Sequence, residues 1–237
     1  MSDPLEIKEK KKYVRSMFNS IAETYDLLNH VLSFGIDFYW RWRAIKRLKP
    51  VNPELLLDMA TGTGDFAIAA SKQLKARIVG LDLSEQMLAV GHRKLLKRQL
   101  TETIHFACAD AENIPVGDNV FDAATVGFGV RNFENLTKGL REFCRVLRPG
   151  GHLVILEFSR PRIFPFKQLY FFYFRTILPL VGKLISKDPE AYTYLPDSVA
   201  KFPEPESLAE ILKNAGFSSV EYKPLTFGIV HIHHAIK

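Results

Sequence analysis

The sequence has few cysteines and lacks a long uncharged apolar run. Only two cysteines occur in 237 residues, Cys108 and Cys144, and their separation matches neither a disulfide framework nor a metal site. This favours a reducing compartment, the cytoplasm, with both thiols in structural roles. Three basic residues interrupt the most apolar region, residues 163–185, and the N-terminal stretch lacks the apolar core of a secretory signal. We therefore expect no membrane-spanning helix and no signal peptide.

Two motifs that are typical of other enzymes are also missing. No tyrosine is followed four residues later by a lysine, a pair on which many dehydrogenases rely. No Asn/Asp-Pro-Pro-Tyr tetrapeptide, used by enzymes that modify exocyclic amines of nucleic acids, is present. These absences disfavour an oxidoreductase and an RNA-modifying enzyme, and we expect no nucleic-acid partner.

Positive charge is in excess, with a formal net charge of +6 and a sequence pI of about 9.2. Such a balance favours an anionic partner, nucleic acid or a lipid surface, although it also serves solubility. Basic residues gather near the start of the chain and again in "RWRAIKRLK", residues 41–49. Because Trp42 and Ile45 interrupt the second cluster, it predicts an amphipathic helix. We favour a helix packed on the protein, with peripheral membrane contact as the alternative.

Strand-like and helix-like segments alternate regularly through the middle of the chain. Strands are expected over residues 54–59, 76–82, 103–110, 120–129 and 152–158, and helices over 84–100, 136–147 and 203–217. Ser84 is the expected N-cap of the first of these helices, and residues 219–236 supply two further β-rich runs. This alternation predicts an α/β fold with a doubly wound parallel sheet.

We expect a single domain, residues 1–237, with two additions to its core. Apolar residues at helical spacing predict an N-terminal helical cap over residues 1–50. The core should comprise residues 51–159 and 204–237. Between its two parts, residues 160–203 hold ten aromatic residues in 44 positions and form an insertion after the fifth strand.

A glycine-containing turn lies within "LLLDMATGTGDFAIAA", residues 55–70. Its "GTGDFA" fits the dinucleotide fingerprint, and Asp82 lies 18 residues beyond Gly64, near the position of a ribose-binding acid. NAD is therefore a candidate ligand. A dinucleotide, however, brings phosphates to the helix N-terminus, and here that place carries Asp65.

Carboxylates gather where the predicted strands end, and the turn itself contains no basic residue. Such a crevice suits a cationic ligand that has ribose hydroxyls and no phosphate, which favours S-adenosyl-L-methionine over NAD. In this interpretation Asp82 accepts the ribose hydroxyls, and Asp110 with the backbone of Ala111 contacts the adenine. The expected cofactor-binding residues are Asp58, Gly62, Thr63, Gly64, Asp82, Asp110 and Ala111. Capping of a helix remains the alternative role for Asp65 and for Asp110.

Four stretches carry a resemblance that extends over nearly the whole chain: "YDLLNHVLSFGIDFYW" (25–40), "LDMATGTGD" (57–65), "GFGVRNF" (127–133) and "RVLRPGGHLVILEFS" (145–159). In these the sequence resembles the ubiquinone/menaquinone biosynthesis C-methyltransferases, a family of class I S-adenosylmethionine-dependent methyltransferases. The resemblance implies a Rossmann-like seven-stranded sheet. It also shows departures, of which the most important is Asp37 at a position often held by histidine.

The resemblance implies transfer of a methyl group to a ring carbon of a prenylated quinol. The favoured substrate is demethylmenaquinol, giving menaquinol; a benzoquinol of ubiquinone biosynthesis is the alternative, and an NAD-dependent oxidoreductase is a more distant one. An aromatic carbon becomes nucleophilic once a ring hydroxyl loses its proton. We expect Arg131 to stabilise the quinolate and Asn132 to orient its oxygen, with Tyr25 and Asp37 as weaker candidates for accepting the proton. A salt bridge to a neighbouring acid is the alternative role for Arg131.

Two further features have more than one interpretation. The seven aromatic residues between Phe164 and Phe174 fit a channel for the prenyl tail or ordinary burial against the sheet. His231, His233 and His234 are close in sequence, but no acid or cysteine at supporting spacing accompanies them, so we expect no metal site. The sequence does not indicate an oligomeric state.

Overall fold

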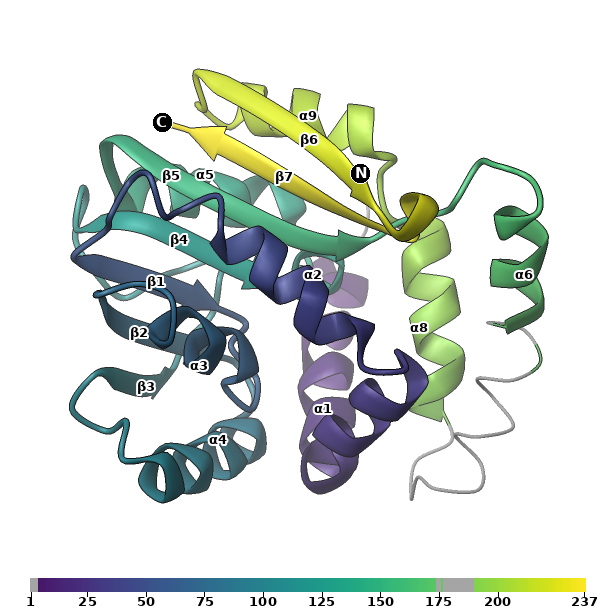
Figure 1. The fold of residues 1–237 in the computed structure, drawn as a ribbon, viewed down its shortest axis with the longest axis horizontal. Coiled ribbons are helices and arrows are strands. Elements are labelled where there is room, and N and C mark those ends of the chain that lie inside the picture. Colours follow the sequence, from purple (N-terminus) through teal and green to yellow (C-terminus); the bar gives the residue numbers. More distant parts are fainter. Residues whose placement is uncertain (1–3, 174–175, 177–189) are drawn as a thin grey trace.

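The computed structural model describes residues 4–173, 176 and 190–237, and it shows a seven-stranded sheet with helices on both faces (Figure 1). The strands are β1 (Leu55–Met59), β2 (Arg77–Asp82), β3 (Ile104–Cys108), β4 (Phe121–Gly127), β5 (Leu147–Phe158), β6 (Ser219–Leu225) and β7 (Val230–Ile236). Their order is β3-β2-β1-β4-β5-β7-β6, with β1 to β5 parallel and β7 antiparallel to both neighbours. This confirms the predicted doubly wound α/β fold.

The helices in the described residues follow the expected alternation. They are α1 (Pro4–Leu32), α2 (Ile36–Ile45), α3 (Asp65–Ser71), α4 (Glu85–Arg98), α5 (Leu136–Val146), α6 (Phe166–Phe172), α8 (Glu190–Lys201) and α9 (Pro205–Asn214), with short 3-10 turns η1 (Val130–Asn132) and η3 (Thr226–Gly228). The predicted N-cap of α4 is confirmed, because the Ser84 hydroxyl accepts a hydrogen bond from the Met87 amide at 3.2 Å. None of these helices combines the length and the apolar character that a membrane crossing requires.

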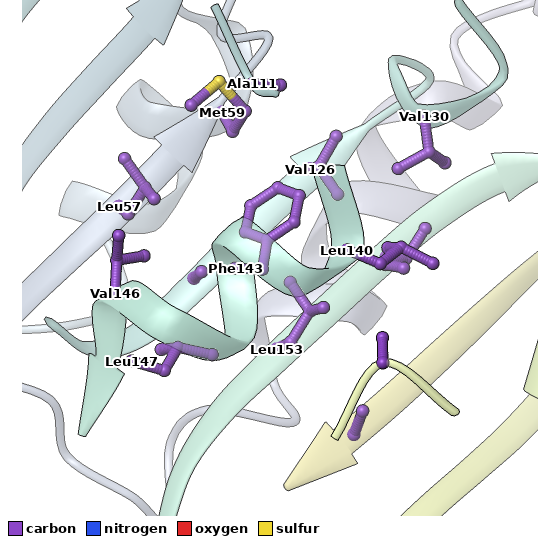
Figure 2. Close-up of a cluster of buried hydrophobic side chains, with 14 of the residues drawn as sticks. Leu57, Met59, Ala111, Val126, Val130, Leu140, Phe143, Val146, Leu147 and Leu153 are labelled. Carbon is purple, nitrogen blue, oxygen red and sulfur yellow. The ribbon is translucent and has the colours of Figure 1, made fainter. Parts of the chain in front are cut away.

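The central strands are apolar on both sides because both faces of the sheet are covered. Leu57 and Met59 belong to the cluster that packs against α5 and α9, in which Phe143 is fully buried (Figure 2). Leu56, their neighbour in β1, points to the opposite cluster with α2 and α3. Such two-sided burial is typical of parallel strands and explains why the strand sequences do not alternate with polar residues.

The second half of the expected N-terminal cap packs directly on the sheet. Trp40, Ala44 and Ile45 of α2 are buried in the same cluster as Leu56, and the Trp40 indole donates to the Thr226 hydroxyl at 2.7 Å. Helix α1 instead packs along α4 and contacts α8 (Figure 1). Within residues 1–50, α1 therefore forms the part that stands away from the sheet.

One boundary differs from the prediction. Strand β5 begins at Leu147 and not at residue 152, so Pro149, Gly150 and Gly151 belong to the strand. The pairing with β4 shifts register between Phe121 and Ala123, which indicates a bulge that accommodates this segment. Gly150 has φ of +75°, a conformation in which glycine carries no steric penalty.

The insertion, residues 160–203, contains α6 and α8; α8 contacts α1, and α6 lies beyond α8 at the edge of the molecule (Figure 1). Phe174, Arg175 and residues 177–189 of this segment lie outside the described residues. The described part brings Tyr170 and Tyr194 into contact with α1 in a third apolar cluster.

Candidate functional site

The turn after β1 has the tight backbone that its glycines predict. Ala60, Gly62 and Gly64 all have positive φ, and the Gly64 amide donates to the Thr61 carbonyl at 2.8 Å. A Cβ on Gly64 would lie 2.5 Å from the Phe106 ring, so both the conformation and the packing require glycine there. The turn is thereby fixed with its amides directed to the carboxyl edge of the sheet.

Asp82 organises this edge from the end of β2. Its two carboxylate oxygens accept the amide hydrogens of Gly62 and Ser84, each at 2.8 Å. Burial raises the pKa of Asp82, while these hydrogen bonds act in the opposite direction. Each oxygen keeps a second lone pair, with which it can accept a hydroxyl of a bound ribose.

Asp58, at the end of β1, lies beneath the turn. It is fully buried and accepts the hydroxyl hydrogens of Thr61 at 2.6 Å and Thr125 at 2.7 Å. Burial raises the pKa of Asp58 to about 6 in spite of these hydrogen bonds. This placement gives Asp58 a role in holding the turn, since it does not line the cavity described next.

A first cavity, of about 100 Å³, opens beside the turn, and we call it the cofactor cavity. The predicted residues that line it are Gly62, Asp82, Asp110, Ala111, Asn132 and Tyr25. Thr63 and Gly64 shape the turn without lining the cavity. Of the seven predicted cofactor-binding residues, four therefore line the cavity: Gly62, Asp82, Asp110 and Ala111. The other three, Asp58, Thr63 and Gly64, support the turn beside it.

The turn itself contains no basic residue, but cations from two helices pair with the acids around it. Lys11 of α1 forms an ion pair with Asp110 at 2.7 Å, and Lys94 of α4 pairs with Asp65 and with Asp26. Asp65 at the N-terminus of α3 therefore does not present a free charge to a ligand. The sequence could not show this, because the cations come from helices far from the turn in sequence.

A second cavity, of about 80 Å³, adjoins the first, and we call it the ring cavity. Phe18, Tyr25 and Phe128 line both cavities, and we call them the aromatic partition. Asp37 and Arg131, two of the predicted catalytic residues, line the ring cavity. The aromatic partition offers ring faces to a sulfonium cation, which favours the predicted cofactor over a phosphate-bearing one.

Arg131 is held rigidly at the wall of the ring cavity. Its Nη1 donates to the Phe128 carbonyl and, at 2.9 Å, to Glu157, while Nε donates to the Ser198 hydroxyl at 3.2 Å. In the described part of the chain no partner is recorded for Nη2. The pair with Glu157 is buried, with side chains 6% and 2% exposed. Nη2 is therefore the part of the guanidinium that remains for a ligand.

Glu157 is the main residue that the sequence interpretation missed. Burial raises the pKa of Glu157, and the charge of Arg131 opposes this shift. Glu157 also accepts the Phe158 amide hydrogen at 2.9 Å. Its position at the end of a buried strand, opposite the "VRN" turn, was the only available signal.

Asp37 lies in the ring cavity within a cluster of polar partners. Its carboxylate accepts hydrogen bonds from Arg41 and from the Ser33 hydroxyl at 2.7 Å, and lies 2.7 Å from His30 Nδ1. Burial alone would raise the pKa of Asp37, but Arg41 and these partners lower it below its ordinary value. Asp37 is consequently ionised near neutral pH and is a weak base.

Tyr25 and Asn132 complete the predicted catalytic set. Burial raises the pKa of Tyr25, so its hydroxyl stays protonated near neutral pH and acts as a donor. Asn132 lines the cofactor cavity and accepts the Tyr194 hydroxyl hydrogen at 3.0 Å. The structure thus brings all four predicted residues to the two adjoining cavities.

A third cavity, of about 310 Å³, continues from the ring cavity, and we call it the tail cavity. The residues that line both are Asn29, Leu32, Ser33, Trp40, Phe158 and Leu195. The remaining walls are mainly apolar and come from the α1–α2 turn, the α6 region and the turn before β7: Phe34, Ile36, Phe166, Leu169, Tyr170, Tyr173 and Ile229. Part of the aromatic segment of the insertion therefore lines a cavity and is not buried against the sheet.

Solved structures match the fold over almost the whole chain. The [4+2]-cyclase SpnF superposes with a TM-score of 0.73 at 18% identity, covering 96% of both chains. A methyltransferase of Thermotoga maritima, described as S-adenosylmethionine-dependent and a possible histamine N-methyltransferase, gives 0.68 at 20% identity over 94% of this chain and 99% of that one. At such identities the likeness establishes the fold alone.

Sequence relatives are much closer. A demethylmenaquinone methyltransferase of Bacteroides fragilis is 49% identical over 97% of this chain and 94% of its own. A ubiquinone/menaquinone biosynthesis C-methyltransferase of Geotalea daltonii is 44% identical over 95% of this chain and 96% of its own. The ubiE/COQ5 methyltransferase family matches residues 6–237. The chain therefore belongs to the ubiE/COQ5 methyltransferase family, as its motifs predicted.

Proposed function

We propose that the protein methylates a ring carbon of demethylmenaquinol, with S-adenosyl-L-methionine as the methyl donor, in menaquinone biosynthesis. The observation that carries this is that three cavities adjoin one another in a row. Their lining residues are largely charged in the cofactor cavity, mixed in the ring cavity and mainly apolar in the tail cavity. A cofactor with ribose and amino acid parts, a quinol ring and a prenyl tail need these three environments in this order. Relatives at 49% and 43% identity that are named demethylmenaquinone methyltransferase support the naphthoquinol over the benzoquinol.

The residues of the cofactor cavity fit this cofactor. The carboxylate of Asp82 is placed to accept the ribose hydroxyls, and Asp110 and Ala111 to contact the adenine. Gly62 allows close approach of the methionine part, because nothing lies within 4 Å of the place where its Cβ would be. When bound, the cofactor supplies an electrophilic methyl group on a sulfonium. The partition of Phe18, Tyr25 and Phe128 faces that group from the ring cavity.

Arg131 prepares the acceptor for attack. As the quinol hydroxyl loses its proton, negative charge develops on the oxygen and on the neighbouring ring carbon. Nη2 of Arg131 donates to that oxygen in an enclosed, weakly screened environment, where such a contact stabilises charge strongly. Arg131 stays protonated throughout, because a guanidinium does not act as a base at neutral pH.

The protons leave through other groups. Asp37 accepts the hydroxyl proton, directly or through a water, because Tyr25 is held in its protonated form. Since Asp37 is a weak base, quinolate stabilisation by Arg131 controls this step more than the acceptor does. With the methyl group transferred from the sulfonium sulfur to the ring carbon, loss of the proton on that carbon would restore the aromatic ring as a quinolate. The quinolate oxygen would then take back one proton, so that one proton is released per turnover.

The same proposal includes a cytoplasmic location with peripheral contact to the membrane. A prenylated quinol is confined to the bilayer by its apolar tail, so an enzyme without a spanning helix in its described residues must meet it at the lipid surface.

The direct test is product analysis with purified protein. S-adenosyl-L-methionine and either demethylmenaquinol or the corresponding benzoquinol are supplied, and the methylated quinone is quantified by mass spectrometry. We expect methylation of the naphthoquinol, and calorimetric binding of S-adenosylhomocysteine with no binding of NAD. Methylation of the benzoquinol alone would assign the alternative substrate, and binding of NAD alone would overturn the proposal.

A further inference from the structure

Large apolar side chains that the folded chain leaves in water occur on α2 and beside the tail cavity. Phe34 of the α1–α2 turn is 83% exposed, and Phe38 and Trp42, at spacings of four residues along α2, are 58% and 43% exposed. Leu169 of α6, which lines the tail cavity together with Phe34, is 58% exposed. We call these residues, with Tyr39, the docking face. A group of large apolar side chains this exposed marks an interaction surface.

Phe34 is held outward by the backbone. It has φ of +52° and is followed by Gly35 at +73°, and the turn is fixed by hydrogen bonds from the Phe34 amide to Val31 and from the Gly35 amide to His30. A left-handed conformation costs a bulky residue about 1–2 kcal/mol. The hydrogen bonds that close the C-terminus of α1 offset part of that cost, and the turn leaves the Phe34 ring at the surface. The ring is therefore available for contact with something outside the chain.

The charges beside the docking face are mainly positive, although Glu221 of β6 lines the same hollow as Trp42 and Lys46. Arg43 stacks over the Tyr39 ring at 5.6 Å and Lys46 over the Trp42 ring at 5.2 Å. Arg47 and Lys49 follow on the same helix end, and none of these four cations has a carboxylate within salt-bridge distance among the described residues. Asp37, the only acid of residues 34–49, is buried and paired with Arg41. The surface therefore attracts an anionic partner.

We propose that the docking face binds an anionic lipid surface and opens the tail cavity toward the bilayer. Tyr39 and Trp42 are suited to the headgroup region, where amphipathic aromatic rings gather, and Phe34 to the acyl boundary beneath it. Arg43 and Lys46 meet the lipid phosphates. The proposed prenyl tail then passes into the protein between the α1–α2 turn and α6 without crossing water. This inference rests on the proposed function and locates its membrane contact at the docking face. Lipid binding by this face can be tested without any substrate.

The test is cosedimentation of the full chain with two kinds of vesicle, phosphatidylcholine alone and phosphatidylcholine enriched in phosphatidylglycerol. We expect binding to the anionic vesicles that weakens with salt, and much weaker binding to the neutral ones. Trp42→Ser and Lys46→Glu together should reduce partitioning by at least about tenfold. Phe34→Asn, which tolerates the left-handed conformation, should reduce it through the apolar contact alone. Leu96→Asn with Lys97→Glu on α4 is the matched control, because Leu96 is 65% exposed and lies far from α6.

Methylation of a tail-less quinol in solution separates this inference from the proposed function. The Trp42→Ser and Lys46→Glu variant should retain that activity, because neither side chain lines the ring or tail cavity. Equal binding to both kinds of vesicle, or an equal loss in the α4 control, would overturn the docking face. So would a dimer of the unmodified chain, seen by analytical ultracentrifugation without lipid, that the same variant converts to a monomer, because the face would then bind a second copy.

Discussion

The cofactor side and the acceptor side of the site are built in different ways. The cofactor cavity is formed by the ends of β1, β2, β3 and β4 and the segments that follow them, together with α1, and its Asp82 is tied to backbone amides. The ring and tail cavities are formed mainly by α1, α2, α6 and α8, which come from two separate parts of the sequence. The first depends on strand and turn geometry, and the second on how helices pack over the sheet.

This difference indicates which part of the site determines specificity for the methyl acceptor. A strand end followed by a glycine turn binds the cofactor in the same manner whatever lies above it, so the fold is compatible with many reactions. The acceptor is selected by Arg131 and by the apolar walls that the N-terminal helices and the insertion supply. Changes on the acceptor side should therefore alter turnover and substrate choice, and changes on the cofactor side should alter cofactor affinity and the stability of the turn.

The largest effect is expected at Arg131. Arg131→Ala should lower kcat about 10³-fold, because the quinolate loses its enclosed donor, while S-adenosylhomocysteine binding in calorimetry stays near its original value. The substitution also leaves Glu157 buried without its partner, which should cost about 3 kcal/mol of unfolding free energy. The double variant Arg131→Ala with Glu157→Gln should regain stability in urea titrations but not activity. Recovery of activity along with stability would show that Arg131 has a structural role only.

Asp58 should show the largest effect on the cofactor side, as a dependence of stability on pH. Its folded pKa of about 6 lies above its ordinary 3.8, so the folded state binds the proton more tightly than the unfolded state. Protonated Asp58 therefore adds to the free energy of unfolding below about pH 4, and this contribution is lost as pH rises through 6. The loss amounts to about 3 kcal/mol at most. Urea unfolding from pH 4 to 7 should show a shallower decline in Asp58→Asn. Equal slopes in the two proteins would contradict burial of this carboxyl; Asp118→Asn, on an exposed carboxylate, is the control.

Asp82→Asn should act on affinity rather than on chemistry. Removing its charge weakens hydrogen bonds from the ribose and from two backbone amides, which should reduce S-adenosylhomocysteine affinity about 10- to 100-fold. At saturating cofactor, kcat should change far less. Calorimetry gives the first quantity and steady-state kinetics the second. A fall in kcat with unaltered affinity would show that Asp82 acts on the acceptor and not on cofactor binding.

The smallest effect is expected in the tail cavity. Leu169→Asn places a polar group in the apolar wall and should raise KM for a long-tailed quinol about tenfold, because about two methylene groups lose their apolar contact. KM for a tail-less quinol should not change. Leu96→Asn on α4 provides the control for an exposed leucine. Equal changes for both substrates would show that the cavity does not hold the tail.

Much of the fold and about half of the site could be predicted from the sequence. The alternation of strands and helices in the core, the N-cap at Ser84 and the position of Asp82 follow from periodicity and turn chemistry over short stretches. The start of β5 was misplaced, because the bulge opposite Phe121 depends on a partner strand and not on local residues. Lys11 and Lys94 were missed for a similar reason, since each pairs with an acid that is distant in the sequence.

By itself the sequence determined the sheet, the glycine turn and the family, because strand ends, tight turns and helix caps are local and each leaves a pattern in a few residues. Only the tertiary structure decided that Asp58 supports the turn from below, that Glu157 fixes Arg131, and that α1, α2 and α6 enclose a continuous path for ring and tail. These features depend on which side chains meet across elements that are distant in the sequence. Such meetings are set by packing and charge compensation in the folded chain, which no short stretch of sequence contains.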